Sequence, residues 1–139
     1  MNEEGIIGIA IYLACDKMKK TKRKKRFWMK EWLKKRNTFS HHNLLDELRL
    51  SSPSDYRNYL RMDNTKCSNL LNMITPMIEK QYTCMREPIS PAQRLSCTLR
   101  YLATGVNVEE LKFITAIALQ TIGKIIIETC DAIITVLKK

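Results

Sequence analysis

The sequence predicts an all-α protein, and three observations lead to this class. Apolar residues recur at helical spacing through most of the chain, whereas alternating apolar and polar runs are scarce. Four Gly and four Pro among 139 residues leave few positions for hairpin turns. The length and the apolar fraction of 45% suit one globular domain of ordinary size. We therefore expect a small helical domain that carries a basic N-terminal leader.

Residues 1–38 are predicted to form an apolar leader followed by a basic arm. The apolar run at 5–14 is half as long as the roughly 20 residues that a membrane helix needs. Glu3 and Glu4 precede this run and the cations follow it, which is the reverse of the charge order in a signal peptide. We expect a short helix that packs on a core or on a partner, and neither secretion nor a membrane location.

The basic arm concentrates the charge of the whole chain. Residues 17–36 contain twelve Lys or Arg and one acid, so their net charge is +11 in a chain of net charge +10. Such a block suits three roles: binding nucleic-acid phosphates, acting as a nuclear-import signal, or lying on an anionic membrane surface. Trp28 and Trp32 are four residues apart and share a helical face, so we expect them to pack on the helical domain rather than stack on bases.

Residues 39–139 are predicted to form the helical domain, beginning with helices in 39–82. Leu44, Leu45 and Leu48 have helical spacing, and Ser52 with Pro53 is typical of a helix N-terminus. A further helix contains Leu70, Leu71, Ile74 and Ile78, and Pro76 is expected to kink or end it.

Residues 90–137 are predicted to form three consecutive helices. Ser90, Pro91 and Gln93 make a capping box, and Gly105 suits a left-handed helix stop after a face that includes Leu95, Leu99 and Leu102. Asn107 begins a short helix, and a long helix follows that contains Ile122, Ile125, Thr129 and Ile133. This layout matches a helix-turn-helix unit at about 90–137: a helix, a tight turn, a short helix, a turn and a longer helix. The same layout also occurs in plain helical bundles.

The solvent face of the long helix holds the candidate base-reading residues. Gln120 suits an adenine edge, Thr121 a base or a phosphate, and Lys124 a phosphate or guanine. The same three residues also suit a routine polar face of an amphipathic helix. Gly123 lies between them and suits close approach to another helix or to a phosphate backbone.

The sequence predicts no metal site and no cofactor. Its five cysteines contain no C-x-x-C pair, which favours reduced and mostly buried thiols in an intracellular protein. His41 and His42 are adjacent and would point in different directions on a helix, so they make a poor metal pair.

Several stretches resemble the N-terminal region of PIF/Harbinger-type transposases and their domesticated nuclease-like relatives. The most specific is MREPISPAQRLSCTLRYLATG (85–105), followed by EELKF (109–113) and IGKIIIETCDAI (122–133). HNLLDELRL, DYRNYLRMD and the basic tract with FWMKEWL support it, so that the likeness covers nearly the whole chain in order.

The resemblance implies an α-helical DNA-recognition region placed ahead of a DDE nuclease domain, which uses three carboxylates to hold divalent metal. The chain ends at Lys139, where the family continues into that domain, and none of its acids matches the triad. The resemblance therefore implies a nuclear, non-enzymatic module that binds duplex DNA, by likeness a transposon terminal repeat, with a Myb-like accessory protein as a plausible partner.

The turn before the last helix departs from the family pattern. Ala116 and Ala118 stand where relatives tend to have a polar or basic residue and a Ser, which removes an N-cap worth about 1 kcal/mol and a phosphate donor. Cys67 stands where an aromatic residue is usual. These departures suggest a degenerate or truncated copy in which site-specific binding is weakened.

The predicted DNA-binding residues fall into two groups. The arm contributes Lys19, Lys20, Lys22, Arg23, Lys24, Lys25 and Arg26, and the last helix contributes Gln120, Thr121 and Lys124. Two alternatives stay open: a non-catalytic interaction fragment of a domesticated transposase, and the N-terminal part of a metal-dependent nuclease. Self-association would use the leader, the last helix or the methionines, although the methionines are more typical of a core; they are Met62, Met73, Met77 and Met85.

Overall fold

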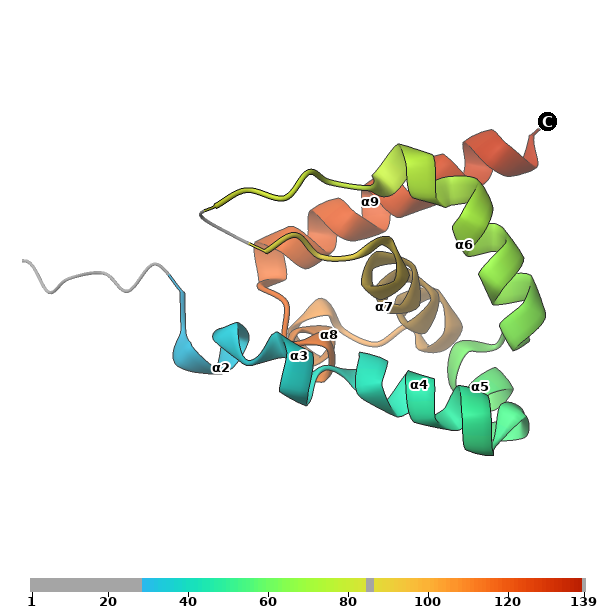
Figure 1. Ribbon diagram of the computed structural model, residues 1–139, viewed down its shortest axis with the longest axis horizontal. Helices are drawn as coiled ribbons and strands as arrows, with labels where there is room; N and C mark the ends of the chain where they lie inside the picture. The colour runs from blue at the N-terminus through green and yellow to red at the C-terminus, as the bar shows by residue number, and fades with distance from the viewer. Residues whose placement is uncertain (1–28, 85–86, 139) are drawn as a thin grey trace, which may run out of the picture. The chain divides into compact units, whose positions relative to one another are not determined.

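The computed structural model describes residues 29–84 and 87–138. Within these residues the secondary-structure elements are all helices (Figure 1). The chain divides into two compact units, 1–30 and 31–139, and the fold described below is that of the second. The all-α class is therefore confirmed. The apolar leader, Trp28 and the seven predicted arm residues from Lys19 to Arg26 lie outside the described residues.

The second unit begins with two short helices, α2 (Glu31–Lys34) and α3 (Arg36–Phe39). It therefore starts before residue 39, where we expected the helical domain to begin. The unit starts earlier because the end of the basic block packs on it: the Trp32 ring stacks on the Phe113 ring, with the two centroids 5.6 Å apart. Trp32 thus packs on the helical domain as its position on a helical face predicted.

Three helices follow: α4 (His41–Ser51), α5 (Pro53–Leu60) and α6 (Asn64–Ile78). The Ser40 hydroxyl accepts a hydrogen bond from the His42 amide and caps α4. Pro53 occupies the first position of α5, as predicted. α6 continues through Pro76 and ends at Ile78, so the proline lies in its last turn.

Local signals set the ends of α7 (Pro91–Thr104), α8 (Val108–Thr115) and α9 (Leu119–Leu137). The predicted capping box is present, since the Gln93 amide donates to the Ser90 hydroxyl and the Ser90 amide donates to the Gln93 side chain. Gly105 ends α7 with φ of 61°, in the left-handed region that it was predicted to adopt. The Asn107 side chain accepts from the Glu109 amide and begins α8.

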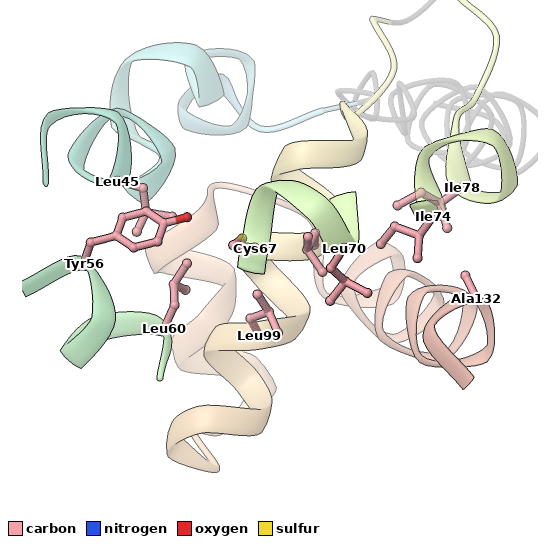
Figure 2. Packing of buried hydrophobic residues seen from close by; sticks show 10 residues of the cluster. Leu45, Tyr56, Leu60, Cys67, Leu70, Ile74, Ile78, Leu99 and Ala132 are labelled. Carbon is pink, nitrogen blue, oxygen red and sulfur yellow. The ribbon is translucent and has the colours of Figure 1, made fainter. Parts of the chain in front are cut away.

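Two groups of buried apolar side chains hold these helices together. Figure 2 shows the first group, to which α4, α5, α6, α7 and α9 contribute Leu45, Tyr56, Leu60, Cys67, Leu70, Ile74, Ile78, Leu95, Leu99 and Ala132. The second group joins α7, α8 and α9 through Cys97, Leu111, Ile117, Ile122 and Ile125, together with Ile89. Leu44 is exposed, and so is Leu102, which therefore does not share the buried side of Leu99.

Candidate nucleic-acid interface

The helices α8 and α9 meet at a sharp angle. They are bent by 97° across a break formed by residues 116–118. Ala116 turns the chain with φ of 52° and is almost fully buried, so its methyl group packs while its backbone adopts a conformation that glycine prefers. Ala118 occupies the N-cap of α9, and among the described residues no side chain caps this helix. In the described residues, the first amides of α9 therefore have no side-chain acceptor, and the Thr121 amide donates to the Ala118 carbonyl at 2.9 Å.

The three predicted base-reading residues are placed differently along the first turns of α9. Gln120 and Lys124 are exposed, whereas Thr121 is half-buried. Thr121 lines a cavity of about 200 Å³ together with Lys80 and Arg94. Gln120 and Lys124 are therefore accessible to a large ligand, and Thr121 faces a recess beside the loop that precedes α7. A Cβ added at Gly123 would meet no atom within 4 Å beyond its chain neighbours and the backbone of its own helix, so this glycine is not in close contact with another helix.

A buried arginine organises the region beside Thr121. Arg94 is only 6% exposed, and its guanidinium donates to a Glu128 oxygen 2.8 Å away. Lys80 lies 3.4 Å from the same oxygen. The hydrogen bond from Arg94, followed by the nearby charge of Lys80, lowers the pKa of the Glu128 carboxyl. This cluster joins α7 to α9 and pairs the buried Arg94 with a carboxylate, so we assign it a structural role.

The end of the basic block lies against α8 (Figure 1). Besides the stack of Trp32 on Phe113, the Arg36 guanidinium donates to the Pro88 carbonyl at 3.4 Å. Asn37 donates to the Glu87 carboxylate, also at 3.4 Å. The last residues of the block are thus held on the surface of α8 and of the loop before α7.

The charge of α8 and α9 contrasts with that of the basic block. Residues 108–137 contain two cations and four acids, for a net charge of −2. One of the cations, Lys112, is bound to Glu109 at 2.6 Å and lies over the Phe113 ring. Within the described contacts, Lys124 is therefore the cation of α8 and α9 that remains available to bind a polyanion.

A polar junction joins three helices on another side of the unit. His41 of α4 contacts the Tyr59 hydroxyl of α5 through Nδ1 at 3.1 Å and the Ser96 hydroxyl of α7 through Nε2 at 3.2 Å. Ser96 donates its own proton to the Gln93 carbonyl, so it accepts from Nε2–H and leaves Nδ1 to accept from Tyr59. Burial, followed by the charges of His42 and Arg100, lowers the pKa of His41 to about 4. His41 is therefore a neutral structural histidine.

The described thiols show no sign of activation. Cys67 and Cys97 are buried, Cys130 is half-buried and Cys84 is exposed, and all four are free. Burial raises the pKa of the Cys97 thiol to about 12. In residues 29–84 and 87–138, no group of three or more His, Cys, Asp or Glu is arranged to hold a metal ion.

Two features of the surface were not anticipated from the sequence. Phe113 stacks on Trp32. The sequence indicated this contact only in that an aromatic residue stands on the polar side of a short helix. Met73 and Met77 are about half exposed, so treating them as ordinary core residues was wrong. Among the described helices none is both long and apolar enough to span a membrane by itself, and only the bent pair α8 and α9 passes such a test together.

Comparisons of the chain with protein-family models, with curated proteins and with solved structures found no match.

Proposed function

We propose that this protein is a nuclear DNA-binding module in which α8 and α9 act as a helix-turn-helix and the basic block supplies electrostatic attraction. The observation that carries the proposal is the stack of Trp32 on Phe113, because it fastens the end of the block to the first helix of this pair. The bend of 97° across three residues lies within the range of about 90–120° typical of the motif. The sequence resemblance to the recognition region of Harbinger-type transposases points the same way.

The two parts have separate roles because their charges differ. α8 and α9 have a net charge of −2 and would gain little from a phosphate backbone, whereas residues 17–36 have a net charge of +11. Each phosphate that a cation neutralises releases counterions and contributes about 0.9 to the salt slope of the affinity. The block therefore accounts for a sequence-independent affinity that decreases steeply with salt.

Sequence discrimination is assigned to the exposed side of α9. Gln120 suits the paired donor and acceptor of an adenine edge, and Lys124 suits a guanine or a phosphate. The uncapped start of α9 at Ala118 leaves backbone amides for a phosphate but lacks the hydroxyl donor that a serine would add. We therefore expect specific binding that is real but weaker than that of a module with a polar turn.

The test is fluorescence anisotropy with labelled duplexes over a range of salt concentrations. Replacing Lys22–Arg26 with alanine removes five cations and is expected to lower the salt slope by roughly 4 for every duplex. A control replaces two exposed cations, Arg61 at the C-cap of α5 and Lys66 of α6, and should leave the slope unchanged. Equal slopes for the arm variant and the wild type would reject the assigned role of the block.

Specificity is tested separately, with a duplex selected from a random pool and with a terminal-repeat duplex. Gln120→Ala is expected to reduce the preference for the selected duplex by roughly tenfold while keeping the salt slope. Trp32→Ala keeps every charge, so it should keep the slope and reduce the preference. If the wild type binds selected and scrambled duplexes equally, or binds anionic vesicles but not DNA, the proposal fails.

The proposed module binds DNA without cleaving it. Purified protein is expected to leave supercoiled plasmid intact in Mg²⁺ or Mn²⁺, with EDTA making no difference. Metal-dependent nicking that EDTA abolishes, and that follows the protein through purification, would instead support the nuclease alternative.

A further inference from the structure

α9 has a second apolar face on the side that its own helical unit leaves uncovered. Ile127, Ile134 and Leu137 are 65%, 47% and 66% exposed, and the half-buried Cys130 lies between them along the helix. Their spacing of three, four and three residues places them in one row. A contiguous apolar row of this kind on a surface helix is typical of a protein interface.

The rest of α9 packs on the core, and the half-buried Ile126 and Ile133, which pack against the two buried groups, adjoin the row on one side. Ile125, Thr129 and Ala132 are buried against α6 and α7, on the opposite side of the helix. Between the buried side and the exposed row lies a polar edge that carries Lys124, Asp131 and Lys138 at seven-residue intervals. An exposed apolar row that extends beyond the buried side of a helix indicates that the row also has a partner.

The heptad positions of the row define which partner fits. With Ile127 and Ile134 at position a, Gly123, Cys130 and Leu137 occupy d. Position e then carries alternating charges, Lys124, Asp131 and Lys138, whereas position g carries the apolar residues Ile126 and Ile133. In a parallel pair e lies beside g of the other helix, so Asp131 would face isoleucine. In an antiparallel pair e lies beside e and g beside g.

We propose that this row binds α9 of a second copy of the chain in an antiparallel pair related by a two-fold axis. Ile127 then lies opposite Cys130 of the partner subunit, and Lys124 lies opposite the partner's Asp131. The two-fold axis repeats each contact, so both charged pairs are complementary. The same register places Ile126 beside the partner's Ile133.

Gly123 supports the register independently of the charges. It lies opposite the partner's Ile134, and the space above its backbone is open in the described chain. A position without a side chain accepts a large isoleucine without a clash, which allows the two helices to approach closely. The core layers from Gly123 to Ile134 cover three turns of each helix, about 16 Å at 1.5 Å per residue.

The test uses the full chain, reduced and freed of nucleic acid, in sedimentation equilibrium at about 0.15 M salt. The wild type is expected to be a dimer at roughly 100 µM. Lys124→Asp makes both charged pairs repulsive, and so does Asp131→Lys, so each single variant should dissociate about tenfold more readily. An equimolar mixture of the two variants pairs opposite charges again and should return to the wild-type affinity, as should the double variant.

Two further variants separate this interface from other sources of association. Ile127→Glu places a charge in the middle of the row and is expected to give a folded monomer, as judged by circular dichroism and melting temperature. Leu50→Glu alters a residue that is still more exposed but lies on α4, and should leave the dimer intact. A monomeric wild type, single charge variants with unchanged affinity, or a mixture that fails to recover would each overturn the proposal.

Discussion

His41 makes the stability of the fold depend on mildly acidic pH. Its ring is 7% exposed and its two nitrogens are both engaged, by Tyr59 and by Ser96. The pKa of this histidine is about 4 in the folded chain and 6.5 in the unfolded chain. Between these values the unfolded chain binds more protons than the folded chain, so the free energy of unfolding decreases as the pH falls below 6.5. Above pH 6.5 the histidine is neutral in both states and the fold keeps its full stability.

The size of the effect follows from the two pKa values. A difference from 6.5 to about 4 corresponds to about 3 kcal/mol once the pH has fallen below both. At pH 5 the loss relative to pH 7.5 is about 2 kcal/mol, because the unfolded histidine is almost fully protonated and the folded one is not. Arg100, whose guanidinium lies over the Tyr59 ring at 4.0 Å, opposes protonation of the neighbouring His41.

The assay is urea unfolding at a series of pH values between 4.5 and 7.5, with wild type, His41→Gln and His42→Gln in parallel. His41→Gln keeps a donor and an acceptor but cannot titrate, so its difference from wild type should shrink by about 2 kcal/mol from pH 7.5 to pH 5. The adjacent His42→Gln is the control: it removes the smaller contribution of the His42 charge but leaves His41 buried, so it should keep most of the pH dependence of the wild type. If wild type and His41→Gln give parallel curves, the assignment of a buried neutral His41 is refuted.

Four other substitutions test the backbone and the buried ion pair. Gly105→Ala should lower the free energy of unfolding by about 1 kcal/mol because φ is positive, whereas Gly123→Ala should raise it by a similar amount because it lies inside a helix with open space around it. Arg61→Gly should stabilise by about 0.5–1 kcal/mol, since Arg61 ends α5 with φ of 57° and is exposed; a lower melting temperature would contradict this. Glu128→Gln should destabilise by about 1–3 kcal/mol, measured by urea unfolding at pH 7, because Arg94 stays buried without a negative partner.

The ends of the last three helices could be predicted because their signals are local. The capping box at Ser90, the stop at Gly105 and the cap at Asn107 depend on residues within one turn of the chain. Leu102 shows the limit of this reasoning. Its spacing from Leu99 indicates a shared face, but Leu99 belongs to the first buried group whereas Leu102 is exposed.

The candidate interface was less predictable for the same reason. The sequence identified Gln120 and Lys124 as polar residues on the long helix, and both are exposed. Nothing in the spacing of Thr121 indicates that it would line a recess with Arg94, because the loop that forms the other wall is distant in sequence. Contacts of this kind depend on how distant segments pack in the folded chain, so they produce no periodic pattern in the sequence.

Lys124 belongs to both proposals for α9, and this overlap leads to one more prediction. A duplex that α9 reads would occupy Gln120 and Lys124, and the second copy would occupy Lys124 through the partner's Asp131. The two complexes should therefore compete, whereas a duplex held only by the basic block should not disturb the dimer. Adding the selected duplex at about 0.15 M salt is expected to convert the dimer into a one-to-one complex of chain and DNA in sedimentation velocity, and a scrambled duplex should bind to the dimer. If both duplexes leave the dimer intact, α9 does not serve both partners, and one of its two assigned roles is wrong; the variants Gln120→Ala and Ile127→Glu then identify which.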